Sequence, residues 1–437
     1  MINRWNDIDE REYASRHRSH QPTPENDLLR QAYATTLLGA DNDLTMHGGG
    51  NTSVKTTVTG DTGNLRRALF VKATGTPLNM FTPDCFVAMD LDFLEGLKGT
   101  GGIDDETMAR EFRRHQLIPS DKLPSIESLM HAFIPAKFVA HTHPAAILKI
   151  VNRVGGRELL KECFGGDLAY IPYTRMGFDL AKASSEAARE NAGCLGVVIG
   201  HHGLVAWGGD ARAVYDTTIG IATKAEEFLS KMFTRGIAPP EREVSADLSA
   251  RNYELIAPVI RECLARVSRN IDGVGLTGDN ISLAPLNTPD VLELINSPDG
   301  RNIISNPPMT PDYPMLRRIL PVWVDVDIGG VTENIFAIVN DTISHFAADY
   351  KSYLESHGVT DTAPADLLPR AIIIPQVGVV CFGLDNAAAG MAADFTRQAL
   401  AIRRAVVETG GVYKSLPERH LFDMQYRGYQ KDKVKVK

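Results

Sequence analysis

Apolar and polar positions in the first half of the chain alternate between helical and strand periods. Apolar residues recur every three or four positions from Asp27 to Gly39 and from Ala211 to Met232, which predicts amphipathic helices. Short apolar runs bounded by glycine, proline or polar residues lie between them and are typical of buried strands. We expect strands at 69–73, 138–143, 168–173, 196–200 and 203–208, with further helices at 145–151 and 179–191.

A polar, proline-containing stretch, residues 234–245, marks the domain boundary that we expect. Beyond it, helical spacing predicts helices at 253–267, 334–357 and 387–409, and apolar runs predict strands at 322–327 and on both sides of a turn within 370–383. This order of elements predicts a smaller C-terminal α/β domain over residues 246–437. Residues 1–25 are polar and are expected to form an N-terminal arm on the surface or on a partner subunit.

Composition narrows the class of protein without identifying it. The chain has 437 residues, of which 43% are hydrophobic and 23% charged, as is ordinary for a globular protein of two or three domains. A net charge of −8 argues against a nucleic-acid partner or an anionic membrane surface. Five scattered cysteines without a C-x-x-C pair favour a reducing compartment. With no apolar signal core at the start and no run long enough to span a membrane, we expect a cytoplasmic protein.

Two histidines alternate at the end of one predicted strand. Because residues i and i+2 of a strand point to the same face, His141 and His143 can turn onto one metal ion. A third imidazole from the pair His201-His202 would leave one coordination position open, as in catalytic zinc sites. Taken alone, His-x-His is a weak signal, and two satisfied histidines at a strand end are the more frequent explanation.

Two loops could hold an anion through backbone amides and short hydroxyl or amide side chains. Gly48–Gly50 are followed by Asn51, Ser53 and the cation Lys55, and a predicted strand ends at Thr74-Gly75. In isolation, a plain glycine-rich hairpin and a plain strand-end turn remain the favoured interpretations.

A third segment combines a predicted helix start with a carboxylate. Ser125 is a good helix N-cap, and Glu127 would lie in the first turn, where an acidic residue stabilises a helix by about 0.3–1 kcal/mol without any catalytic role. His131 lies four residues further, on the same helix face as Glu127. For His131 alone, a structural or supporting role is favoured over metal binding.

These pieces stand in one order that resembles the class II aldolase/adducin family. The resemblance covers residues 27–232 and rests on five motifs: Gly50-Asn51-Thr-Ser53-Val-Lys55, Ala73-Thr74-Gly75, Ser125-Ile-Glu127 with His131, His141-Thr-His143-Pro144, and His202-Gly203. The chain is most similar to the aldolase half of bifunctional rhamnulose-1-phosphate aldolase/short-chain dehydrogenase proteins. The stretch from Arg370 to Tyr429 also resembles the later part of that half. The glycine-rich dinucleotide domain that follows in those proteins is not found in this sequence.

The resemblance implies a fold and a set of site residues. It implies an α/β fold class, namely a three-layer αβα domain over residues 26–236 with a central, mainly antiparallel sheet, assembled as a homotetramer. It implies a divalent metal, commonly zinc, with Glu127 as catalytic base. The implied metal ligands are His141, His143 and His202, the last chosen because it directly precedes glycine. The implied phosphate-binding positions are Asn51, Ser53, Thr74, Gly75 and Ser125.

Two positions are left open by this resemblance. Ile126 stands where some sugar-phosphate aldolases have a second serine, so one phosphate donor is missing. Some members use a tyrosine as proton donor, and neither Tyr170 nor Tyr173 can be matched to it.

The implied function is a lyase of carbohydrate metabolism. We expect a metal-dependent aldolase that cleaves a rhamnulose-1-phosphate-like ketose 1-phosphate to dihydroxyacetone phosphate and an aldehyde through a metal-stabilised enediolate. A sugar-phosphate epimerase, dehydratase or decarboxylase of the same family, and a non-catalytic adducin-like scaffold, are the alternatives. A separate dehydrogenase would be a further partner, in place of the fused domain.

Overall fold

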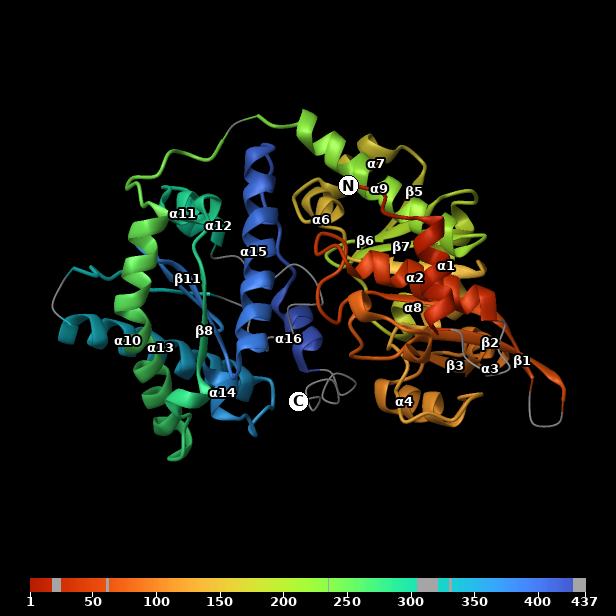
Figure 1. Ribbon diagram of the computed structural model, residues 1–437, viewed down its shortest axis with the longest axis horizontal. Coiled ribbons are helices and arrows are strands. Elements are labelled where there is room, and N and C mark those ends of the chain that lie inside the picture. Colours follow the sequence, from red (N-terminus) through yellow and green to blue (C-terminus); the bar gives the residue numbers. More distant parts are fainter. Residues whose placement is uncertain (18–24, 60–62, 235, 305–320, 330–331, 427–437) are drawn as a thin grey trace. The chain divides into compact units, whose positions relative to one another are not determined.

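The computed structural model describes residues 1–17, 25–59, 63–234, 236–304, 321–329 and 332–426 (Figure 1). The chain divides into two compact units. One contains Met1–Met232 together with the late helix α16 (Glu418–Tyr426), and the other contains the described residues between Phe233 and Ser415. The domain limits expected from the sequence, 26–236 and 246–437, stay a prediction.

A seven-stranded sheet forms the centre of the first unit, in the order β3-β2-β1-β4-β7-β6-β5 (Figure 1). Its strands are β1 (Asn51–Thr59), β2 (Leu65–Lys72), β3 (Phe86–Asp90), β4 (Phe138–Thr142), β5 (Leu168–Ile171), β6 (Gly196–Ile199) and β7 (Gly203–Gly208). Within the described part of this sheet, β5 and β6 pair in parallel, whereas all other neighbours are antiparallel. The expected α/β fold with a mainly antiparallel central sheet is therefore confirmed.

Helices cover both faces of this sheet because its strands alternate their apolar side chains. On β2, Leu69 and Val71 face one core, and Ala68 and Phe70 face the other. The first core is closed by helices α3, α4, α5 and α8, and the second by α1, α2 and α9. The helices are α1 (Asp7–His17), α2 (Glu25–Gly39), α3 (Leu91–Gly96), α4 (Asp105–Arg114), α5 (Ser128–Phe133), α6 (Ala145–Val151), α7 (Gly156–Phe164), α8 (Phe178–Glu190) and α9 (Ala211–Lys231). This arrangement gives the three layers that the resemblance implied.

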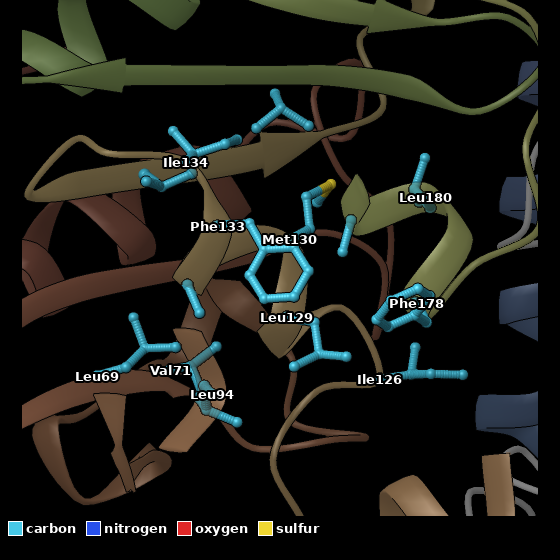
Figure 2. Close-up of a cluster of buried hydrophobic side chains, with 14 of the residues drawn as sticks. Leu69, Val71, Leu94, Ile126, Leu129, Met130, Phe133, Ile134, Phe178 and Leu180 are labelled. Atoms are coloured by element: carbon cyan, nitrogen blue, oxygen red, sulfur yellow. The ribbon is translucent and has the colours of Figure 1, made fainter. Parts of the chain in front are cut away.

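The short helix α5 is held in place by the first of these cores. Figure 2 shows Leu129, Met130 and Phe133 of α5 surrounded by side chains from β2, α3 and α8. All three are less than 5% exposed. Because protein cores pack at crystal-like density, α5 is fixed in position, and the residues at its start are fixed with it.

The second unit has a four-stranded sheet in the order β8-β11-β10-β9. Its strands are β8 (Ser282–Leu286), β9 (Val322–Trp323), β10 (Ala371–Ile374) and β11 (Gly378–Gly383). Its helices are α10 (Ala246–Asp272), α11 (Pro289–Asn296), α12 (Gly300–Ile304), α13 (Thr332–Ser356), α14 (Pro364–Leu367) and α15 (Asn386–Glu408). Helices α11, α12 and α15 share one apolar core with β10 and β11. The prediction of a smaller α/β domain is confirmed.

In this unit, β8, α11, α12 and α14 were not predicted, and two predicted elements have clearly different bounds. Helix α10 begins at Ala246 and not at Tyr253, because the Ser245 side chain accepts a hydrogen bond from the Leu248 backbone N–H at 3.2 Å and caps the helix. Strand β9 ends at Trp323 and not at Asp327, and the Asp325 carboxylate accepts from Trp323 Nε1 at 2.7 Å. Across the described helices, none combines the length and apolar character required for a membrane span.

Candidate metal centre

Three histidines come together where β4 ends and β7 begins. His141 lies on β4, opposite Val205 of β7, and His143 follows just after the strand ends. His202 lies in the turn between β6 and β7, where His201 adopts a positive φ of 54°. Gly203 makes this approach feasible, because a Cβ atom there would lie 2.3 Å from the Thr142 carbonyl oxygen.

The three imidazoles face one another through their Nε2 atoms. His141 Nε2 lies 3.0 Å from His143 Nε2 and 3.1 Å from His202 Nε2, and the three side chains are buried. His141 Nδ1–H donates to the Leu204 carbonyl oxygen at 3.0 Å, so that a neutral His141 ring offers only a lone pair at Nε2. Burial lowers the pKa of His141 well below its ordinary value, which keeps the ring neutral.

This donor set fits a divalent cation. Three nitrogen ligands at about 2.0–2.1 Å from a tetrahedral zinc lie roughly 3.3 Å apart, close to the observed separations. Without a cation, His141 Nε2 can accept a proton from one neighbouring ring only. Among the described residues, no other group of three or more His, Cys, Asp or Glu side chains lies close enough together to hold one metal ion. His141, His143 and His202 would therefore be its ligands.

The Glu127 carboxylate lies against this triad and is 5% exposed. Its Oε1 atom is 3.2 Å from His202 Nε2, and its Oε2 atom is 3.6 Å from His141 Nε2. Oε1 has no hydrogen-bond partner among the described residues. Burial raises the pKa of Glu127, whereas His202 and the Asn51 amide, whose Nδ2 donates to Oε2, lower the pKa and hold it well below its ordinary value. The carboxylate is therefore ionised and can accept a proton.

The predicted helix start at Ser125 is wrong. Helix α5 begins at Ser128, and Glu127 occupies the N-cap position without capping the helix by its side chain. The Ser125 hydroxyl accepts from the Glu127 backbone N–H at 3.3 Å, ahead of the helix, and from Asn51 Nδ2 at 3.1 Å. The Ser125 N–H donates to the Lys72 carbonyl oxygen at 2.9 Å, which holds this residue in an extended segment beside β2. The helix therefore starts later than predicted. Glu127 precedes its first turn, and the Glu127 carboxylate faces the histidines.

Four of the five predicted phosphate-binding residues lie in adjoining segments. The Thr74-Gly75 turn is joined to the Ser125 segment, because Thr74 N–H donates to the Leu123 carbonyl oxygen at 2.7 Å. Gly75 has a φ of 76°, and nothing lies within 4 Å of where its Cβ would be, so its backbone is open to a ligand. Asn51 joins this group through its hydrogen bond to Ser125. The Ser53 hydroxyl instead points inward and donates to His131 Nδ1 at 2.7 Å.

The cation beneath these loops is Lys72, which the sequence pattern did not single out. Lys72 is 3% exposed, and its ammonium group donates to the carbonyl oxygens of Gly48 at 2.8 Å and Gly50 at 2.9 Å. Lys55, which was expected to provide a cation in the loop, instead donates to the Ile134 carbonyl oxygen at the end of α5. A charged residue within the apolar run of β2 was the signal that could have identified Lys72.

Both tyrosines considered as proton donors lie near β5. The Tyr170 hydroxyl is adjacent to Gly200, since it lies 2.6 Å from where a Gly200 Cβ would be. Tyr173 packs against His420 of α16, with ring centroids 4.9 Å apart. These contacts do not select either tyrosine as a donor.

Profiles of known protein families match both parts of the chain. The profile described as "Class II Aldolase and Adducin N-terminal domain" matches residues 30–229, and that described as "Aldolase class II, second domain" matches residues 251–434. The chain is 28% identical over 399 residues to "Uncharacterized oxidoreductase YuxG" of Bacillus subtilis (strain 168), covering 90% of this chain and 56% of that protein. The chain thus spans little more than half the length of this relative.

Two solved structures are similar to about half of this chain. The N-terminal class II aldolase domain of a conserved protein from Thermoplasma acidophilum is 33% identical, covering 49% of this chain and 98% of that one, with a TM-score of 0.45. L-Fuculose-1-phosphate aldolase from Thermus thermophilus is 17% identical, covering 48% and 98%, with a TM-score of 0.32. The two profiles, which together match residues 30–229 and 251–434, show that this chain belongs to the class II aldolase and adducin family.

Proposed function

We propose that this protein is a metal-dependent aldolase that cleaves a ketose 1-phosphate, of the rhamnulose 1-phosphate kind, to dihydroxyacetone phosphate and an aldehyde. The observation that carries the proposal is the ionised, buried Glu127 carboxylate beside three converging imidazoles. Family membership supports an aldolase-type activity, and the name of the Thermus thermophilus relative describes a sugar-phosphate aldolase.

The proposed cofactor is a divalent metal, with zinc as the first candidate, held by His141, His143 and His202. When bound, this cation would act as a Lewis acid that polarises substrate oxygens and stabilises the negative charge of an enediolate. Three neutral ligands would leave the full charge of the ion available. The buried position of the triad would limit the access of water.

Glu127 is the proposed base of the reaction. It accepts the proton of the substrate C4 hydroxyl group, the C3–C4 bond breaks, and the aldehyde leaves. The electron pair of the broken C3–C4 bond stays on the ketose fragment as an enediolate. A later proton transfer to C3 converts this enediolate to dihydroxyacetone phosphate. Asn51 Nδ2, 2.6 Å from Glu127 Oε2, orients the carboxylate and favours its ionised form.

The substrate phosphate is proposed to bind at Asn51, Ser53, Thr74, Gly75 and Ser125. The open Thr74-Gly75 turn and the adjoining Ser125 hydroxyl support this position. Asn51 and Ser53 can reach a phosphate only by exchanging the partners that they have in this structure. Lys72 would add positive charge beneath the glycine loop.

The remaining proposals concern the protein's context. A homotetramer is proposed from the family, and a separate dehydrogenase partner from the resemblance to the bifunctional proteins. A cytoplasmic location is proposed from the scattered cysteines and from a sequence with no apolar signal core and no run long enough to span a membrane. The non-catalytic, adducin-like alternative would not require a buried carboxylate against three histidines, so the geometry favours an enzyme.

The direct test is incubation of the metal-loaded protein with a panel of ketose 1-phosphates, with coupled detection of dihydroxyacetone phosphate. Release from at least one of them is expected, together with its loss after treatment with a chelator. If no substrate in the panel releases it, the aldolase proposal fails, and an epimerised, dehydrated or decarboxylated product would point to the sibling reactions.

A further inference from the structure

A continuous line of hydrogen bonds runs from β1 through α5 to the carboxylate of Glu127. The Ser53 hydroxyl lies 2.7 Å from His131 Nδ1, and His131 Nε2 is hydrogen-bonded to Asn51 Oδ1. Asn51 Nδ2 in turn lies 2.6 Å from Glu127 Oε2 and 3.1 Å from Ser125 Oγ. All five side chains are at most 6% exposed, so water does not compete for these contacts.

The donor and the acceptor of each hydrogen bond in this line can be assigned from the contact between Asn51 and Glu127. Asn51 Nδ2 lies 2.6 Å from Glu127 Oε2 and 3.1 Å from Ser125 Oγ and donates to both, so the Asn51 amide faces Glu127 with its nitrogen. The reverse orientation would place two acceptor oxygens 2.6 Å apart. Asn51 Oδ1 then faces His131, which must donate from Nε2. The Nδ1 atom of the neutral ring is left as an acceptor, and it receives the Ser53 hydroxyl proton.

This orientation of the Asn51 amide also allows the Ser125 hydroxyl to donate a hydrogen bond. Its Oγ atom accepts from Asn51 Nδ2 at 3.1 Å and from the Glu127 backbone N–H at 3.3 Å. With these hydrogen bonds accepted, the Ser125 hydroxyl proton can be donated to another group. A flipped Asn51 amide would compete for that proton and would also repel Glu127.

We propose that His131 is a positioning residue, whose Nε2–H group holds Asn51 Oδ1 and thereby fixes the Asn51 amide to face both Glu127 and Ser125. His131 does not touch the reacting groups and acts through Asn51. This inference rests on the proposed function, in which Glu127 is the base and Ser125 a phosphate donor. His131 also lies outside the triad that could hold the metal.

The first test is the protonation pattern of the His131 ring in the wild-type protein with its metal bound. Nitrogen-15 NMR of histidine-labelled protein at neutral pH is expected to show a neutral His131 with its proton on Nε2. The His131→Gln variant assigns the signal. A proton on Nδ1, or on both nitrogens, would overturn the inference. Since no turnover is involved, this result is independent of whether the proposed aldolase reaction is correct.

The second test compares two substitutions at the same position. In His131→Leu, kcat/KM is expected to fall about 10- to 100-fold, while the metal content stays that of the wild type. His131→Gln retains one donor and one acceptor and should recover most of the activity. Met130→Leu, a volume-conserving change on the same helix, is the matched control and should retain wild-type kcat/KM.

The outcomes of this comparison separate the positioning role from other roles. Full activity in His131→Leu would overturn the positioning role, because that variant lacks the hydrogen bond to Asn51. An equal loss of activity in both His131 variants would also overturn it, because His131→Gln keeps a hydrogen-bond donor. Loss of metal in His131→Leu would also overturn it, because His131 would then act on the metal site. If the wild type itself shows no turnover, the proposed function fails, and the NMR experiment alone decides the role of His131.

Discussion

Asn51 Nδ2 lies 2.6 Å from Glu127 Oε2, although the two residues are 76 positions apart in the chain. Asn51 opens β1, in register with His141 of β4, and Glu127 immediately precedes α5. The contact therefore joins β1, which pairs with the strand that carries His141, to the residue that precedes α5. Removing the Asn51 amide tests whether this link matters for the reaction.

In Asn51→Ala, we expect kcat/KM to fall about 10- to 100-fold, because Glu127 loses the donor that orients its carboxylate. The metal content should not change, since Asn51 is not part of the triad. Steady-state kinetics beside metal analysis measures both quantities. Wild-type kinetics in this variant would show that the 2.6 Å contact has no role in turnover.

Removal of a triad histidine is predicted to abolish metal binding. His141→Ala and His202→Ala should each lose the ion that wild-type protein retains through gel filtration, measured by elemental analysis. His115→Ala, at the end of α4 and outside the triad, is the matched control and should keep it. Retention of metal in both triad variants would contradict the assignment of the ligands.

Lys72 and Lys55 form a pair for testing the phosphate loops. In Lys72→Met, the carbonyl oxygens of Gly48 and Gly50 lose their donor, and KM for a phosphorylated substrate should rise about tenfold as the loop loosens. Lys55→Met removes a donor from the end of α5 and should lower stability with little change in KM. Equal effects on KM would show that Lys72 is not specific to the phosphate loops.

The buried His131 predicts a pH-dependent stability. Burial lowers its pKa to about 3 from the ordinary value of 6.5, so between these values the unfolded chain binds more protons than the folded one. The free energy of unfolding should therefore rise with pH from about 3 to 6.5, and the contribution is lost as the pH falls through this window. The effect is about 1.4 kcal/mol per pKa unit at most.

Denaturant titrations across this pH range measure that contribution. His131→Gln should show a shallower dependence of the unfolding free energy on pH than the wild type. Parallel curves for the two proteins would contradict a neutral, buried His131 in the folded state.

The spacing of residues within single helices and strands was sufficient to predict part of this structure. The period of two in the stretch from Phe138 to His143 predicted a strand with two imidazoles on one side, and their Nε2 atoms lie 3.0 Å apart. Helical spacing likewise predicted α2, α8 and α9 closely. In each case the signal lies within one element, where residue spacing alone determines which side chains share a face.

The parts that failed depend on contacts between distant segments. Ser125 was expected to cap a helix, but its hydroxyl is used by Asn51 and its backbone by Lys72, and neither contact can be predicted from local sequence. The approach of Glu127 to the histidines required the pairing of β1 with β4 and of β4 with β7. Strand order in an antiparallel sheet is a property of the whole chain, and residue spacing does not determine it.

Single-turnover cleavage by Glu127→Gln tests whether Glu127 is the base of a metal-dependent aldolase. The amide keeps the size of the side chain but cannot accept the substrate proton. We predict that the metal-loaded variant binds a ketose 1-phosphate that the wild type cleaves, yet releases no dihydroxyacetone phosphate above the uncatalysed rate. Cleavage by this variant at the wild-type rate would contradict the account.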